Sequence, residues 1–342
     1  MHGGYPSEAF GRPVIANVVL VLGSIIAALL LAEGVLRLFA PQPMNGVVFE
    51  YAPRGYPVNK SSGTALFHVG GNTGIYHFIP LHLRGIKQPP EGAERILVLG
   101  DSFTFGVGLS EEDTYLARLQ NKIDPVFGTN RIALLNAGMS GSGTAEHLAF
   151  LEDFGNDIAP RMVLVFVSID DFNRAHFSPL YRLRSTDGLE LDEGTVPTSK
   201  LKTLVDSEAY NFAIQHVQIA QLIRRAVAGI VVPPAKPPTT EISPDRQRLA
   251  RALFRRMKAW CDTHRVKLAV INNGWQQYDW LPKLLSSEGI AAFDATPQVQ
   301  SAIAPDEASY VIQGDGHPNA KGAAVTAEAV WPFIETFVRE NE

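Results

Sequence analysis

The sequence contains a single cysteine, Cys261, among its 342 residues. One thiol cannot form an internal disulfide, and its place in a predicted helix makes it a buried structural residue. No group of histidines, cysteines and carboxylates has the spacing of a metal site, and no phosphate-binding glycine loop is present, so we expect no metal and no cofactor. Lysine and arginine number 30 against 35 aspartates and glutamates and form no long basic run, which argues against nucleic acid binding.

Charge is also missing from one stretch near the N-terminus. The 20 residues from Pro13 to Ala32 carry no charged side chain. A helix of that length crosses the ~30 Å hydrocarbon core of a bilayer, so we predict a transmembrane anchor at 13–36 after a tail at 1–12. A cleavable signal peptide is the alternative, but no small-residue cleavage pattern follows the run. Glu33 and Arg37, one turn apart, can pair at the membrane interface.

The rest of the chain predicts an α/β fold. Residues 37–90 are rich in proline, glycine and polar residues and are interpreted as a linker and N-terminal extension. From residue 91 to 342, apolar strands alternate with helical patterns, which indicates a parallel sheet covered by helices on both faces. Residues 174–240 are too long for a simple crossover and form an insertion. The five predicted strands are Ile96–Leu99, Ile132–Asn136, Met162–Ser168, Val266–Asn272 and Ile290–Phe293.

Two short segments carry candidate catalytic residues. The first strand ends in Gly100-Asp101-Ser102, and the carboxyl ends of parallel strands are where such sheets bind ligands. Ser102 is therefore a candidate nucleophile, although a residue here can also simply cap the next helix. Far downstream, Asp315 stands two residues before His317 in a loop shaped by glycines and a proline. A serine needs a base, and the base needs an orienting acid, which His317 and Asp315 can supply.

Together with the segment Leu135 to Thr144 (LNAGMSGSGT), these motifs resemble the SGNH (GDSL-like) hydrolases. Members of that family are serine esterases and acyltransferases with a flavodoxin-like fold, a three-layer α/β/α arrangement around a five-stranded parallel sheet. The resemblance covers roughly residues 75 to 335. It implies Ser102 as nucleophile, His317 as base and Asp315 as acid. It also implies an oxyanion hole made by the N–H groups of Ser102 and Gly141.

The third family motif departs from the usual Gly-x-Asn-Asp. Here the sequence is Ser168-Ile169-Asp170-Asp171, so Asp170 occupies the position of the amide that donates to the oxyanion. An ionised carboxylate only accepts hydrogen bonds, and losing one oxyanion donor typically costs about 100- to 1,000-fold in rate. Three alternatives remain: Asp170 is protonated, Asn173 replaces it, or two backbone donors suffice. We favour the third.

The acid–base motif departs as well, because its spacing is Asp-x-His where many relatives have Asp-x-x-His. The shorter spacing is similar to that of relatives that modify polysaccharides. The resemblance thus implies an esterase or O-acyltransferase acting on short acyl esters, acetyl above all, of envelope or extracellular carbohydrate. A lipid or lysophospholipid esterase and a non-catalytic glycan-binding scaffold are the alternatives. Candidate substrate contacts are Asn273, Trp275, which can stack on a sugar ring, and Arg84, which we expect at the surface.

The orientation of the predicted anchor rests on two opposing signals. Arg12 precedes it, whereas Arg37, Arg54 and Lys60 follow, and this excess of basic residues disfavours export of the C-terminal part. Anchored relatives usually act on envelope material outside the cytoplasm. The resemblance therefore implies a single-pass protein of the bacterial inner membrane with its catalytic domain facing the periplasm. Whether the protein has protein partners is left open by the sequence.

Overall fold

The computed structural model describes residues 11–168, 170–184, 189–196, 201–205, 207–231 and 242–341. The chain divides into two compact units. One consists of Met1–Asn45 with Glu208–Pro234, and the other of Gly46–Ser207 with Ala235–Glu342. Most of the predicted N-terminal tail, residues 1–10, lies outside the described residues.

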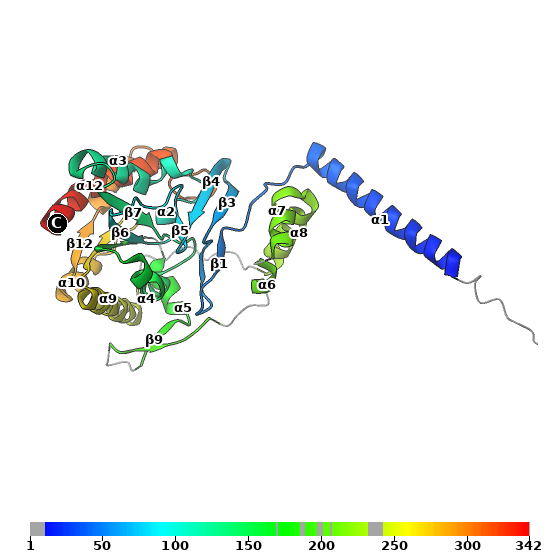
Figure 1. Ribbon diagram of the computed structural model, residues 1–342. Coiled ribbons are helices and arrows are strands. Elements are labelled where there is room, and N and C mark those ends of the chain that lie inside the picture. The colour runs from blue at the N-terminus through cyan, green and yellow to red at the C-terminus, as the bar shows by residue number, and fades with distance from the viewer. Residues whose placement is uncertain are drawn as a thin grey trace, which may run out of the picture. The chain divides into compact units, whose positions relative to one another are not determined.

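The larger unit is built on an eight-stranded sheet with the order β12-β11-β8-β6-β7-β5-β4-β3 (Figure 1). Its first five members are parallel and match the five predicted strands. In chain order these strands run 5-4-3-1-2, which is the flavodoxin-like arrangement. The predicted parallel sheet is confirmed. Its strands are β6 (Glu94–Leu99), β7 (Ile132–Asn136), β8 (Met162–Val167), β11 (Lys267–Asn272) and β12 (Ala291–Asp294).

The sheet also has three antiparallel strands beyond the five that were predicted. They are β3 (Gly63–Val69), β4 (Asn72–Ile79) and β5 (Leu83–Arg84). Gly70 and Gly71, both at positive φ, turn the chain between β3 and β4. Sequence reasoning missed this hairpin because its strands only partly alternate in polarity and lie in a stretch rich in turn residues. Outside the main sheet, β1 (Phe49–Tyr51) pairs with β2 (Pro57–Asn59), and β9 (Tyr181–Leu183) with β10 (Leu191–Glu193).

Helices cover both faces of the sheet and enclose two apolar cores (Figure 1). Successive strand residues point to opposite faces. Thus Ile96 and Val98 pack in one core, whereas Leu97 and Leu99 pack in the other. The first core is covered by α3 (Tyr115–Phe127), α11 (Thr296–Ile303) and α12 (Ala320–Asn341). The second is covered by α4 (Thr144–Ile158), α5 (Asp171–Phe177), α9 (Pro244–His264) and α10 (Leu281–Ser287).

The smaller unit contains α1 (Gly11–Phe39) and two helices of the insertion, α7 (Glu208–His216) and α8 (Gln218–Val231). Of α1, Val14–Phe39 is long and apolar enough to cross a membrane. The predicted pair between Arg37 and Glu33 forms at 2.8 Å. A short helix of the insertion, α6 (Leu201–Val205), belongs to the larger unit.

Candidate active site

Ser102 begins a one-turn helix, α2 (Ser102–Phe105), directly beyond the carboxyl end of β6. The helix is capped by Asp101, whose Oδ1 accepts a hydrogen bond from the Phe103 N–H at 2.9 Å. The other carboxylate oxygen of Asp101, Oδ2, lies 3.4 Å from the Ser102 Oγ, and the Ser102 hydroxyl has a second, nearer partner. The turn needs Gly100, because a Cβ there would lie 2.0 Å from the Thr104 hydroxyl oxygen.

That partner is His317, whose Nε2 lies 2.8 Å from the Ser102 Oγ. On the other side of the ring, His317 Nδ1 is hydrogen-bonded to Asp315 Oδ1. A ring that donates from Nδ1 to a carboxylate presents Nε2 as the acceptor for a hydroxyl proton. Ser102 is only 3% exposed, whereas the side chains of His317 and Asp315 are 24% and 23% exposed. The structure thus brings together the three residues that the motifs singled out, from segments 215 residues apart.

Asn319 holds the loop that carries His317. Its Nδ2 donates to the carbonyls of Ser309 and Val311 at 2.9 and 3.1 Å. Its Oδ1 accepts from the backbone N–H groups of Lys321 and Gly322, at the start of α12. Sequence reasoning did not single out Asn319, although an asparagine just before a helix is a recognisable capping signal.

Gly141 lies in an exposed turn that follows β7 and has a left-handed backbone, with φ of 83°. The turn is closed by Ser142, whose Oγ donates to the Met139 carbonyl at 2.8 Å. The same oxygen lies 3.1 Å from Nε2 of His147, a fully buried residue of α4. Burial lowers the pKa of His147 to about 3, so its ring is neutral at neutral pH. No local sequence motif marks His147, so sequence reasoning did not identify it as a residue that supports the Gly141 turn.

Asp170 has a left-handed backbone, with φ of 72°, at the N-cap position of α5. Aspartate and asparagine tolerate this conformation better than most residues. Its Oδ1 accepts a hydrogen bond from Asn173 Nδ2, and Asn173 Oδ1 accepts one from Arg246. The amide of Asn173 is therefore engaged at both ends, by α5 and α9.

A cluster of charged side chains, Asp101, Asp171 and Arg174, lies next to Ser102. Asp101 and Asp171 are both 0% exposed, and Arg174 Nη1 lies 3.1 Å from the former and 3.8 Å from the latter. Burial, together with the charge of Asp101, raises the pKa of Asp171 well above its ordinary value. Arg174 also donates to the Ser142 carbonyl at 3.0 Å. The guanidinium therefore ties the Ser102 turn, the Gly141 turn and α5 together.

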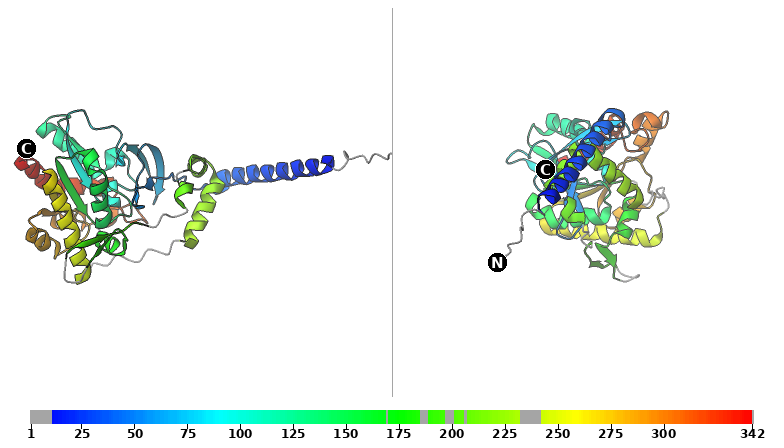
Figure 2. Two further views of the ribbon diagram at one scale, coloured as in Figure 1. Left: turned by 60° about the horizontal axis from the view of Figure 1, so that its bottom comes forward. Right: turned by 90° about the vertical axis from the view of Figure 1, so that its right-hand side faces the viewer.

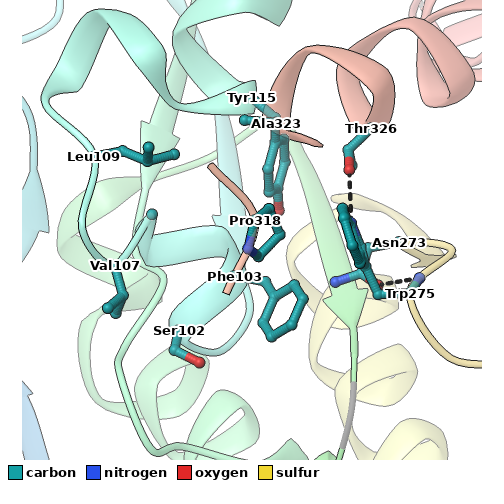
Figure 3. Close-up of a pocket in the computed structure, with 11 residues that line it drawn as sticks. Ser102, Phe103, Val107, Leu109, Tyr115, Asn273, Trp275, Pro318, Ala323 and Thr326 are labelled. Carbon is teal, nitrogen blue, oxygen red and sulfur yellow. Dashed lines mark hydrogen bonds between the residues drawn. The ribbon is translucent and has the colours of Figure 1, made fainter. Parts of the chain in front are cut away.

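A small cavity of about 10 Å³ adjoins Ser102 (Figure 3). Phe103 lies between Ser102 and Trp275, with ring centroids 6.0 Å from Trp275 and 5.3 Å from His317. The Trp275 ring is fixed by its Nε1, which donates to the hydroxyl of Thr326 at 3.0 Å. A cavity of this size holds roughly one water molecule.

Asn273 contributes an unpaired donor to the same cavity. It is 1% exposed, and its Oδ1 accepts from the Trp275 N–H at 3.2 Å. Its Nδ2 has no hydrogen-bond partner in the structure. Figure 3 shows this nitrogen on the side of Phe103 and Pro318. A buried donor without a partner costs free energy, so this atom is suited to an oxygen that enters the cavity.

Arg84 is not at the surface as expected; it is 2% exposed. Its guanidinium lies over the rings of Tyr76 and Phe105, 4.5 and 4.8 Å from their centroids. Burial lowers the pKa of Arg84 from its ordinary value. Its remaining contacts are with the Glu111 carboxylate at 3.2 Å and three backbone carbonyls, those of Phe105, Gly106 (2.9 Å) and Leu109 (2.6 Å). Arg84 therefore holds the loop that follows α2 through the backbone carbonyls of that loop.

Within the described part of the chain, no three histidine, cysteine, aspartate or glutamate side chains are grouped so that they could hold a metal ion. The geometry instead resembles that of a nucleophile, a base and an orienting acid. The sequence profile of the GDSL-like Lipase/Acylhydrolase family matches residues 98–325, more than half of the chain. The chain belongs to this family. The GDSL-like serine of the first motif is Ser102.

Three solved structures are similar to this GDSL-like chain. TesA is 16% identical, over 71% of this chain and 99% of its own, with a TM-score of 0.42. An alpha/beta hydrolase enzyme from the metagenome of Lake Arreo, Spain, is 14% identical over 72% and 97%, with a TM-score of 0.42. A catalytic mutant of an acetylxylan esterase from Geobacillus stearothermophilus is 13% identical over 74% and 96%, with a TM-score of 0.40. None of the curated proteins compared with the sequence matches it significantly.

Proposed function

We propose that this GDSL-like protein is a serine esterase or O-acyltransferase for short acyl esters, with Ser102, His317 and Asp315 as its catalytic residues. The observation that carries the proposal is the 2.8 Å contact between Ser102 Oγ and His317 Nε2, with Nδ1 of the same ring on Asp315. A scaffold without activity has no need for this arrangement of three side chains.

In the proposed reaction, Ser102 Oγ attacks the ester carbonyl while His317 Nε2 takes its proton. The carboxylate of Asp315 stabilises the imidazolium that forms. The tetrahedral oxyanion is received by the N–H groups of Ser102 and Gly141. When the intermediate collapses, the alcohol leaves with the proton from His317 and an acyl-serine remains. Water or a sugar hydroxyl then attacks the acyl-serine while His317 takes its proton. The bond between the acyl carbon and Ser102 Oγ breaks, His317 returns the proton to Oγ, and the carboxylic acid or the new sugar ester leaves.

Asp170 is not part of the oxyanion hole in this proposal. Its carboxylate accepts the amide hydrogen of Asn173, whose other end is held by Arg246. Because these bonds occupy the amide of Asn173, they favour an oxyanion hole of two backbone donors over one in which Asn173 is the third donor. Asp170, at the family position, thus connects the N-terminus of α5 with α9 through Asn173 and Arg246.

Short acyl groups are favoured by the size of the cavity beside Ser102. About 10 Å³ accommodates an acetyl methyl or a single water but not an extended fatty acyl chain. The half-buried Trp275 and the unpaired Nδ2 of Asn273 supply a ring face and a donor, which are suited to a sugar ester. The Asp-x-His spacing supports the same preference for acetylated envelope or extracellular carbohydrate. A lipid or lysophospholipid esterase would need a larger acyl site than this cavity.

We further propose that α1 is an uncleaved anchor in the bacterial inner membrane and that the hydrolase domain, residues 91–342, faces the periplasm. The support is the apolar stretch Val14–Phe39, in which every residue from Val14 to Ala32 is exposed. The anchor would keep the enzyme near envelope substrates.

The test compares the purified chain with its Ser102→Ala variant on nitrophenyl esters of two to twelve carbons. Ser62→Ala, an exposed serine outside the site, is the matched control. We expect a turnover that depends on Ser102 and falls steeply beyond acetate and propionate. A fluorophosphonate probe should label the wild-type and Ser62→Ala proteins but not Ser102→Ala. Absence of labelling in the folded wild-type protein would favour the scaffold alternative, and a preference for long chains would favour the lipid esterase.

A further inference from the structure

The insertion helix α8 exposes its apolar face and packs through its polar face, which is the reverse of a helix in a water-soluble domain. Apolar residues recur at i, i+3, i+4, i+7 and i+8, which makes a continuous stripe: Ile219, Leu222, Ile223, Ala226 and Val227. In a soluble domain such a stripe faces the core. Here Leu222, Ile223 and Val227 are 41%, 58% and 52% exposed.

The opposite face of α8 is the one that is packed. Gln221 is 1% exposed, and its side-chain amide nitrogen, Nε2, donates to the carbonyls of Asn45 and Ile214. Arg224 donates to the same Asn45 carbonyl at 2.7 Å, and Arg225 donates to Gln42 Oε1 at 3.0 Å. The polar face is thus held against the segment that follows α1, and the apolar stripe is left outside.

Hydrogen bonds to Glu33 fix the first residues of α8 at the C-terminal end of the uncharged run of α1. The Glu33 carboxylate accepts the N–H groups of Gln218 and Ile219, the first two residues of α8, at 2.9 and 3.1 Å. Arg37 donates both to Glu33 and to the carbonyl of His216, the last residue of α7. Glu33 is the first charged residue after the uncharged run from Pro13. A helix of that length spans about 30 Å, so Glu33 marks the level at which the hydrocarbon core ends.

We propose that α8 is an interfacial helix that lies on the bilayer crossed by α1, with its apolar stripe in the acyl-chain boundary and Arg224 and Arg225 toward the headgroups. This proposal rests on the membrane anchor proposed above and adds a second membrane contact to it. Figures 1 and 2 both draw α8 across the end of α1 rather than along it, as a helix in the membrane plane would lie. Basic residues beside an apolar stripe are typical of helices that bind anionic lipid surfaces.

The test uses the full chain reconstituted in phosphatidylcholine and phosphatidylglycerol vesicles, with single cysteines carrying an environment-sensitive nitrobenzoxadiazole label. Ile223→Cys and Val227→Cys report on the stripe, Arg225→Cys on the opposite face, and Val21→Cys on α1. Burial raises the pKa of the native Cys261 thiol to about 12, and the unmodified chain serves as the labelling blank. Quenching is measured with lipids that carry a doxyl group near the headgroup end of the acyl chain or deep within it.

We expect shallow doxyl lipids to reduce fluorescence at positions 223 and 227 at least twofold more than at 225. Deep doxyl lipids should quench the label at 21. Equal quenching at 223, 227 and 225, with position 21 still quenched, overturns the α8 proposal and leaves the anchor standing. An unquenched label at 21 overturns the anchor and the α8 proposal with it. A blue-shifted but unquenched label at 223 also overturns the proposal, because the stripe would then be covered by a protein surface.

Discussion

Arg84→Met tests whether a buried cation organises the loop that follows Ser102 and α2. Methionine keeps an apolar stem between the rings of Tyr76 and Phe105 but removes every hydrogen bond of the guanidinium. Three backbone carbonyls then lose a donor. The Gly106 carbonyl keeps the Leu109 N–H at 3.1 Å, whereas the loss at the carbonyls of Phe105 and Leu109 costs about 1–3 kcal/mol for each buried acceptor left unsatisfied. Glu111 loses its partner too, but its side chain is 19% exposed and water can partly replace the arginine.

These costs are not fully additive, and we expect a loss of about 4 kcal/mol in the free energy of unfolding, close to the ~3–5 kcal/mol typical of breaking one side of a buried ion pair. For a domain of this size that corresponds to roughly 10 °C in Tm. Urea denaturation followed by circular dichroism measures the change, with Cm expected to fall at constant slope.

The matched control for Arg84→Met is Arg118→Met. Arg118 pairs with Asp113 at 3.1 Å, but both side chains are well exposed, at 33% and 44%. An exposed pair of this kind contributes at most about 1 kcal/mol, so this variant should unfold close to the wild-type midpoint. If Arg84→Met were no less stable than Arg118→Met, the argument from buried carbonyls would be wrong.

Three further predictions concern the site. Asp170→Asn should keep or raise kcat/KM for nitrophenyl acetate, because asparagine tolerates the left-handed backbone, can still accept from Asn173 through its Oδ1 and adds a donor; a hundredfold loss would show that activity needs the charge of the carboxylate. His147 binds no proton in the folded protein until about pH 3, whereas an unfolded histidine binds one below about pH 6.5. Stability should therefore fall as pH drops from 6.5 toward 3, and thermal unfolding of His147→Gln should show a shallower slope over this range; an unchanged slope contradicts the assignment. Asn273→Ala removes the unpaired Nδ2 and should raise KM for acetylated sugars more than for nitrophenyl acetate, and an equal effect on both substrates would exclude a sugar contact.

Local patterns were sufficient to predict the parallel sheet, and the resemblance of two distant motifs to one family was sufficient to predict the meeting of Ser102 with His317. Apolar runs identify buried strands, and each motif places its side chain at a strand end or in a stiff loop. The five strands and the family assignment are confirmed by the structure and by the family match. The catalytic roles stay predictions that the labelling and ester assays test.

Other features depend on contacts that no local pattern encodes. Arg84 is buried because carbonyls 21 to 25 residues away turn toward it, and an arginine after a short strand gives no sign of this. The same holds for His147, whose neutral ring is set by complete burial in α4. The hairpin of β3 and β4 was missed because its glycines and polar residues look like a linker until the strands are paired in register.

Under the membrane anchoring proposed above, the path of the chain between its two units has a consequence for release of the larger unit. The polypeptide passes between the units three times, after Asn45, after Ser207 and after Pro234. A protease or signal peptidase that cut only after α1 would sever one connection, while α7 and α8 still bound α1 through Glu33 and Arg37. Release of the larger unit should therefore require more than one cleavage, or one cleavage together with dissociation of α7 and α8 from α1.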